Sequence, residues 1–184
     1  MLTGQIGLVH GTGFWPHAIE VVQALAEPVN LAHWNHIIVG VSETEFAEEA
    51  PGGARIRPIS DFDHLEVVWS RFPLTMHQRS LISKWAIDHS ATQGHPGVPY
   101  GYFDVAAIGL SILLKQKTPD WIQAELSNGK TYECAAFADA DYRAAGVHLF
   151  DDDRPTAAVY PASIASRFDP AWFPRKPGTL KGWT

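Results

Sequence analysis

Residues 35–41 read NHIIVGV, two polar residues followed by a short apolar run rich in β-branched side chains. Such a run is typical of a buried strand. Residues 45–50 are expected to form a hairpin with this strand, and the composition of residues 51–53 (PGG) predicts a turn. Residues 54–59 (ARIRPI) and 65–69 (LEVVW) have the pattern of further strands. Short strands joined by short turns predict an antiparallel sheet.

Helical patterns lie on both sides of this region. Apolar spacing predicts helices over residues 17–26 and about 75–91, and a strand is expected over residues 5–9. The apolar run 103–114 is too short to span a bilayer and predicts a buried helix, while the Ala-rich run 134–145, followed by Gly146, predicts another. We therefore expect an α+β fold, with one domain over residues 1–168 and an irregular Pro- and aromatic-rich tail over 169–184.

The composition excludes several classes of function. The net charge of -6 argues against a nucleic-acid partner, because phosphate binding needs a basic face. The single cysteine excludes an internal disulfide and a zinc site built on several thiolates. No apolar run is long enough for a membrane span, and no signal peptide is recognisable. A cytoplasmic protein is expected, or one released by another route, for instance inside a phage particle.

Cys134 points most directly to chemistry. It stands where a strand-like stretch gives way to the Ala-rich helix, and the positive end of a helix dipole lowers a thiol pKa and offers N–H groups to an oxyanion. A lone cysteine is otherwise a common buried structural residue, so it needs a His partner to act as a nucleophile. Among nine histidines, His36 immediately precedes the strand at 37–41. His33 and His36 also form a candidate metal pair, but no matching carboxylate–His spacing supports it, and neither a metal nor a cofactor is expected.

Four motifs occur in a fixed order along the chain. They are NHIIVGV (35–41), EEAPGGARIRPISDF (48–62), GVPYGYFDV (97–105) and YECAAFADADYRAAGVHLF (132–150), and VYPASIASRF (159–168) follows them. Together they resemble the circularly permuted papain-fold hydrolases, the permuted branch of the NlpC-like superfamily, in which the His precedes the Cys. Two departures are Ala135-Ala136, where the family commonly has Ser-Glu, and Gly101 in place of an Asp.

The resemblance implies a curved antiparallel sheet, largely a small barrel, with the nucleophile-bearing helix packed on it. It also implies roles for four residues: Cys134 as nucleophile, His36 as general base, Glu49 as the residue that orients His36, and Tyr100 as a donor to the oxyanion or substrate. Glu48 is the alternative to Glu49, because one residue of register in a strand reverses its face.

The function that we expect is that of a cysteine peptidase or amidase, which cleaves an amide or peptide bond, such as that of a cell-wall peptide, through an acyl-thioester. The alternatives are a lipid acyltransferase or thioesterase-like enzyme, an inactive binding or virion-associated module of the same fold, and a His-based metal hydrolase. Trp172 and Phe173 in the tail are expected to cover the cleft or to contact a second chain, as in a homo-oligomer.

Overall fold

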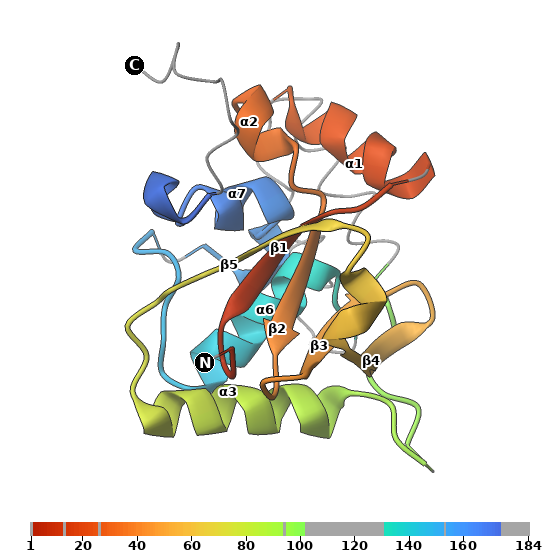
Figure 1. Cartoon of the computed structure of the whole chain (residues 1–184), viewed down its shortest axis with the longest axis vertical. Helices are drawn as coiled ribbons and strands as arrows, with labels where there is room; N and C mark the ends of the chain where they lie inside the picture. Colours follow the sequence, from red (N-terminus) through yellow and green to blue (C-terminus); the bar gives the residue numbers. More distant parts are fainter. Residues whose placement is uncertain are drawn as a thin grey trace.

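The computed structural model describes residues 2–12, 14–25, 27–93, 95–101, 131–152 and 154–173. This part of the chain is α+β, with a five-stranded sheet and several helices around it (Figure 1). The buried helix expected over residues 103–114 lies outside the described residues, as does the tail beyond residue 173. None of the helices in the described part is long and apolar enough to cross a membrane.

The sheet has the order β4-β3-β2-β1-β5, and every neighbouring pair is antiparallel. Its strands are β1 (Ile6–His10), β2 (His36–Gly40), β3 (Glu45–Ala50), β4 (Gly53–Pro58) and β5 (Glu66–Trp69). The predicted strands are therefore confirmed within a residue at each start. The N-terminal strand β1 lies in the interior of the sheet, between β2 and β5 (Figure 1).

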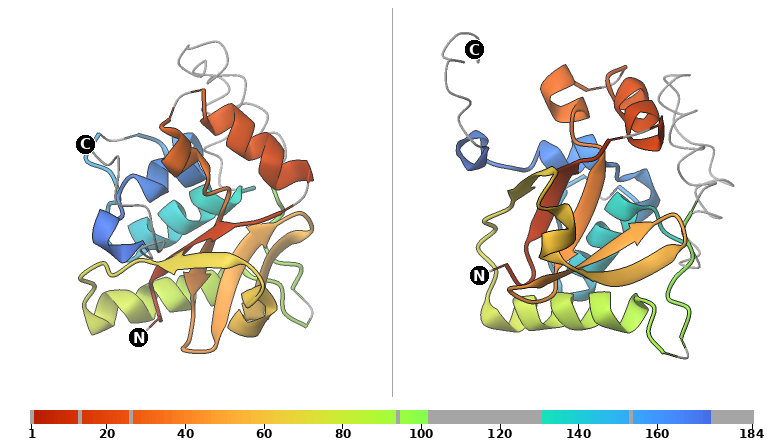
Figure 2. Two further views of the ribbon diagram at one scale, coloured as in Figure 1. Left: turned by 45° about the horizontal axis from the view of Figure 1, so that its top comes forward. Right: turned by 45° about the vertical axis from the view of Figure 1, so that its right-hand side comes forward.

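The helices cover the sheet on one side and at one end. They are α1 (Phe14–Gln23), α2 (Val29–Ala32), α3 (Met76–His89), α6 (Cys134–Ala144) and α7 (Pro161–Ala165), with 3-10 turns η1 (Ile59–Phe62), η2 (Thr156–Ala158) and η3 (Pro170–Trp172). Helix α6 packs against β2, α3 packs against α6, and α1 and α2 lie beyond the end of the sheet (Figures 1 and 2). The helix predicted over 17–26 begins three residues earlier than expected.

Alternation along the strands gives the sheet two different faces. On the inner face, Ile37 and Val39 join Cys134, Ala138 and other residues in the largest core cluster, beneath α6. On the outer face, Ile38 packs with Phe46 and Phe62 in a smaller cluster. Consecutive residues of β2 and β3 therefore lie alternately in the core beneath α6 and in the smaller outer cluster.

Long-range hydrogen bonds close the inner core. The hydroxyl of Tyr142 on α6 donates to the carbonyl of Gly4 at 2.6 Å, 138 residues away in the chain. Tyr142 is fully buried, so this bond satisfies a hydroxyl that would otherwise lack a partner. It ties the helix that begins with Cys134 to the start of β1.

The first residues of the C-terminal tail differ from the expectation. Trp172 packs edge-on against Phe72 at a centroid distance of 5.4 Å, and Phe173 lies 5.7 Å from Trp34. Both aromatic residues are partly buried against the largest core cluster, and neither lines the cavity described below. Residues 172 and 173 thus pack on the core, where burial of their aromatic surface is favourable.

Candidate functional site

A cavity of about 420 Å³ lies at one end of the sheet. Strands β1 and β3 end there and β2 begins there, because neighbouring strands are antiparallel. Its lining includes all four residues singled out from the sequence, which are His36, Glu49, Tyr100 and Cys134. His36 and Glu49 come from β2 and β3, Tyr100 from the loop at residues 95–101, and Cys134 from the start of α6. The fold therefore brings residues up to 98 positions apart to one cavity.

His36 is held by an ionised carboxylate. Its Nε2 lies 3.0 Å from Oε2 of Glu48, whose other oxygen accepts hydrogen bonds from Arg55 and Arg57 at 2.7 and 3.0 Å. Burial alone raises the pKa of Glu48, but its bonds to His36, Arg57 and Arg55 outweigh burial and lower the pKa to about 2. Because a carboxylate only accepts hydrogen bonds, Nε2 carries the proton and Nδ1 of a neutral His36 is left as the base.

The partner of His36 is Glu48 and not Glu49, which we expected from the family motif. In the register of β2 and β3, Ile38 lies opposite Glu48, so His36 and Glu48 project from the same, outer face. Glu49 follows by one residue and therefore projects from the inner face, toward α6. The alternative residue noted in the sequence thus takes the orienting position.

Glu49 is a neutral acid within the cavity wall. Its side chain is fully buried, and neither carboxyl oxygen has a hydrogen-bond partner in the described part of the chain. Burial, together with the nearby Glu133 carboxylate, raises the pKa of Glu49 to about 9, although Arg55 acts in the opposite direction. At neutral pH this residue offers the cavity an O–H donor instead of a negative charge.

Cys134 begins helix α6, as predicted, but its surroundings disfavour the thiolate. Burial raises the pKa of Cys134 well above its ordinary value, and the carboxylate of Glu133 adds to that effect. Backbone N–H groups of Ile37 and Ala135 favour the thiolate but are outweighed. The resting thiol is therefore protonated, contrary to the expectation of a lowered pKa.

Glu133 is a functional neighbour that the motif analysis missed. Its carboxylate caps α6 by accepting from the N–H groups of Ala135 and Ala136, and one oxygen lies 3.5 Å from Sγ of Cys134. An acidic residue directly before a helix is a recognised N-cap signal, so the sequence did contain this information. Among the described residues, no hydrogen bond joins Cys134 to His36, because Sγ bonds to Glu133 and Nε2 of His36 bonds to Glu48.

The remainder of the cavity wall is mostly apolar. Val9, Ile19, Phe62 and Leu65 contribute carbon surface to the same cavity that Cys134 and His36 line. A cavity of this kind suits a ligand with an apolar portion and a polar group placed near the thiol.

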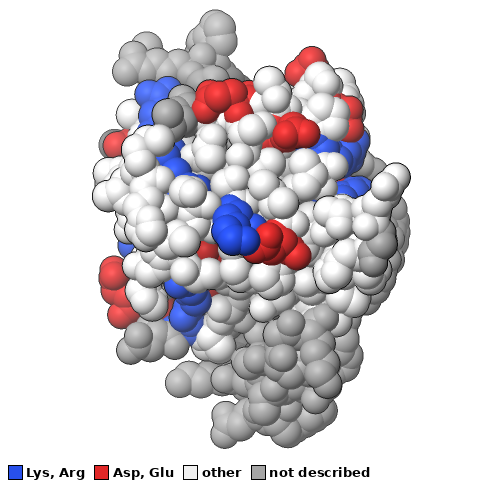
Figure 3. Space-filling view, turned by 90° about the horizontal axis from the view of Figure 1, so that it is seen from below, with Lys and Arg blue, Asp and Glu red and all other residues white. Residues whose placement is uncertain are grey.

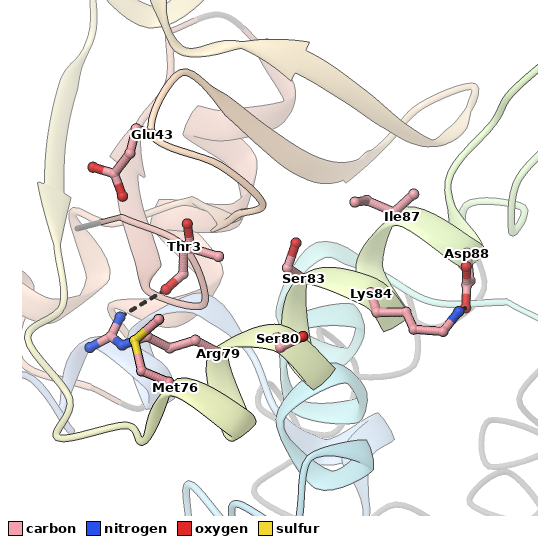
Figure 4. Close-up of a pocket in the computed structure, with 9 residues that line it drawn as sticks. All are labelled: Thr3, Glu43, Met76, Arg79, Ser80, Ser83, Lys84, Ile87 and Asp88. Atoms are coloured by element: carbon pink, nitrogen blue, oxygen red, sulfur yellow. Dashed lines mark hydrogen bonds and ion pairs between the residues drawn. The ribbon is translucent and has the colours of Figure 1, made fainter.

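A second hollow of about 550 Å³ runs along α3 (Figure 4). Among the described residues, no histidine or cysteine lines it, and Arg79 there already donates to the carbonyl of Thr3 at 2.8 Å. On the described part of the face seen from below, acidic and basic side chains are scattered among uncharged ones (Figure 3). The potential nucleophiles that line this hollow include Ser83, which donates to the carbonyl of Val41, and Lys84, which pairs with Asp88. The cavity at the sheet end, where a cysteine and a histidine held by a carboxylate both line the wall, is the better candidate.

The pair of His33 and His36 is not formed. His33 Nε2 lies 3.2 Å from Oε2 of Glu66, whereas His36 bonds to Glu48. The two rings are therefore directed to different carboxylates, and the pair does not make a metal site.

No model of a known protein family matches this chain, and no match is found among curated protein sequences. The function is accordingly inferred from the geometry of the site itself.

Proposed function

We propose that this protein is a thiol hydrolase that cleaves an amide or peptide bond through an acyl-enzyme on Cys134. The observation that carries the proposal is the convergence of Cys134 and His36 on one cavity, with His36 already oriented by the ionised Glu48. A nucleophile, a base and a group that orients the base are the three parts that such catalysis needs. The order of the His-bearing strand before the Cys-bearing helix supports a permuted papain-like arrangement.

In this mechanism, His36 activates a thiol that is protonated at rest. When a substrate carbonyl enters the cavity, Sγ exchanges its bond to Glu133 for one to Nδ1 of His36. Nδ1 takes the proton as the sulfur attacks the carbonyl carbon, and the charge of the resulting imidazolium is balanced by Glu48. The same proton then passes to the leaving amine, and water attacks the thioester with His36 again as base.

Two neutral groups in the cavity wall are the proposed donors to the oxygen that becomes negative. Glu49 is protonated at neutral pH and Tyr100 carries a phenolic hydroxyl, and both line the cavity. Donors that point to a developing oxyanion stabilise the transition state more than the substrate. The apolar walls favour a substrate with an apolar acyl portion, and a cell-wall peptide is one candidate of this class.

A second candidate function is a binding module of the same fold that does not turn over substrate. The observation that favours it is the Glu133 carboxylate, which occupies the N–H groups of Ala135 and Ala136 at the start of α6 and raises the thiol pKa. In such a module the cavity holds a ligand, and Cys134 serves only as packing.

Acyl-enzyme formation separates the two functions. The protein is mixed with p-nitrophenyl esters of short and long acyl chains, and with peptide nitroanilides, while the release of the chromophore and the intact mass are followed. A hydrolase gives one acyl adduct per chain on Cys134, which is absent in Cys134→Ser and strongly slowed in His36→Ala. His77→Ala, an exposed residue on α3, is the matched control and should behave as wild type. If wild type shows no adduct with any ester or anilide between pH 6 and 10, the binding module is the correct function.

A further inference from the structure

A second group of ligating side chains lies next to the cavity and takes no part in the mechanism above. One ligand atom from each of His10, Glu20 and His33 lies within 4.8 Å of the other two. His10 Nδ1 is 2.9 Å from Oε1 of Glu20, and the rings of His10 and His33 stack at 3.9 Å. These residues come from three elements, since His10 ends β1, Glu20 lies on α1 and His33 caps α2.

Two further groups surround this cluster. Glu66, at the start of β5, lies 3.2 Å from Nε2 of His33, and His17 lies 3.4 Å from the second oxygen of Glu20. Asn35 donates to Glu20 at 2.7 Å and fixes that carboxylate in place. The cluster thus combines three imidazoles and two carboxylates on separate elements, which is more than a surface ion pair requires.

We propose that His10, Glu20 and His33 bind one divalent transition-metal ion, for which Zn²⁺ is the best fit. Two imidazole nitrogens and one carboxylate oxygen form a ligand set that Zn²⁺ accepts in tetrahedral sites, with a fourth position left for water or Glu66. The three side chains are 21–35 % exposed, so the site is open to an incoming ion while remaining partly enclosed.

Binding requires one local change. Parallel stacked imidazoles cannot both direct a lone pair at the same ion, so one ring must turn out of the stack. His33 is slightly the more exposed of the two rings, so it is the ring that we expect to turn. His10 Nδ1 also contacts the carbonyl of His33 at 3.0 Å, so it carries the ring proton when no metal is bound, and coordination through this atom requires that proton to move to Nε2 of the same ring.

The ion would also act on the neighbouring cavity. Gly11 follows His10 in the chain and Ile19 precedes Glu20, and both line the cavity that contains Cys134. A metal that joins β1, α1 and the end of α2 fixes this wall of the cavity. The site is separate from the proposed catalytic residues and does not depend on the hydrolase activity.

Zinc binding to the full chain tests the proposal. Zn²⁺ is titrated by calorimetry near pH 7.5, and its affinity is confirmed by competition with a chromophoric chelator. We expect one ion per chain, a higher Tm with Zn²⁺, and at least a tenfold loss of affinity in both Glu20→Gln and His33→Ala. Circular dichroism of both variants without metal establishes that they are folded.

Two controls make the result specific. His77→Ala should bind as wild type, and Cys134→Ser should also bind as wild type, because the thiol lies outside the cluster. The proposal is overturned if wild type binds no stoichiometric Zn²⁺, if Glu20→Gln and His33→Ala keep full affinity, or if Cys134→Ser loses it.

Discussion

Glu48 and Glu49 are neighbours on β3, yet they have opposite protonation states at neutral pH. Glu48 projects from the outer face, where Arg55, Arg57 and His36 lower its pKa to about 2. Glu49 projects from the inner face, where burial and the Glu133 carboxylate raise its pKa to about 9. The comparison shows that two consecutive residues of one strand differ in charge because they lie on opposite faces of the sheet. Glu48 is ionised and hydrogen-bonded, whereas Glu49 is neutral and has no hydrogen-bond partner among the described residues.

The candidate site combines contributions from both faces. The base, His36, comes from the outer face together with its carboxylate partner, whereas the thiol of Cys134 and the acid Glu49 belong to the inner face beneath α6. The cavity lies at the end of the sheet, which is the place where the two faces meet. The following experiments alter one face at a time.

The largest effect should follow from removing the outer-face base. His36→Ala eliminates the imidazole that Glu48 holds, and the rate of acyl transfer should fall by about a thousandfold, because general-base catalysis contributes on this scale. Single-turnover kinetics with an activated ester measure the rate. A variant within a few-fold of wild type would remove His36 from the mechanism.

The next largest effect should follow from removing the Glu48 carboxylate, which joins His36, Arg55 and Arg57 in the outer-face network. Glu48→Gln leaves Arg55, Arg57 and His36 without their carboxylate, and we expect it to lower the free energy of unfolding by about 3 kcal/mol at pH 7. Because the folded pKa of Glu48 lies below its ordinary value, its contribution is present above about pH 4.5 and is lost as pH falls through about 2. Urea unfolding at pH 7 and pH 3 measures this difference.

The exposed Glu45, on the same strand, provides the matched control. Glu45→Gln should change the free energy of unfolding by less than about 0.5 kcal/mol at either pH. Equal effects of the two substitutions would show that the network contributes nothing specific.

The inner-face carboxyl should behave in the opposite way. The folded pKa of Glu49 is raised, so its contribution is complete below about pH 4.5 and is lost as pH rises toward about 9. Glu49→Gln keeps the shape but cannot ionise, and should raise the free energy of unfolding by about 2 kcal/mol at pH 7 with little change at pH 4. Urea unfolding across this range checks the sign, and a stability loss at pH 7 would refute the neutral assignment.

The smallest effect concerns the thiol. Because the pKa of Cys134 is raised, alkylation by iodoacetamide should be slow at pH 7 and should increase only above the ordinary thiol range. Glu133→Gln removes the nearby negative charge and should accelerate alkylation about threefold to tenfold at pH 8. Glu45→Gln is again the control, and an unchanged rate in Glu133→Gln would assign the raised pKa to burial alone.

The sequence was most informative where local patterns determine structure. The alternating and β-branched runs predicted the strands. The order of the motifs singled out His36, Tyr100 and Cys134, and all three line one cavity. The choice between Glu48 and Glu49 needed the register of β3 against β2, in which Ile38 lies opposite Glu48, and the turn over residues 41–44 joins these two strands. A one-residue change at such a turn exchanges the two faces, and composition alone does not determine it.

Other features depended on contacts distant in the chain. His10 and His33 are 23 residues apart and lie on no common motif, so their stacked arrangement had no local signal. The raised thiol pKa results first from burial, which only the complete core produces, and then from the Glu133 carboxylate. Trp172 and Phe173 likewise find partners, Phe72 and Trp34, that only the folded chain brings near.

The interior position of β1 and the bond from Tyr142 to Gly4 affect how this protein folds during its synthesis on the ribosome. All five strands are made by residue 69, but the helix that covers their inner face ends about 75 residues later. At ordinary translation rates the nascent sheet therefore waits roughly 4–15 s with Ile37 and Val39 uncovered. Exposed apolar surface makes a partly folded chain prone to aggregation, so the completion of α6, which Tyr142 ties to Gly4, ends the period of greatest risk for this sheet.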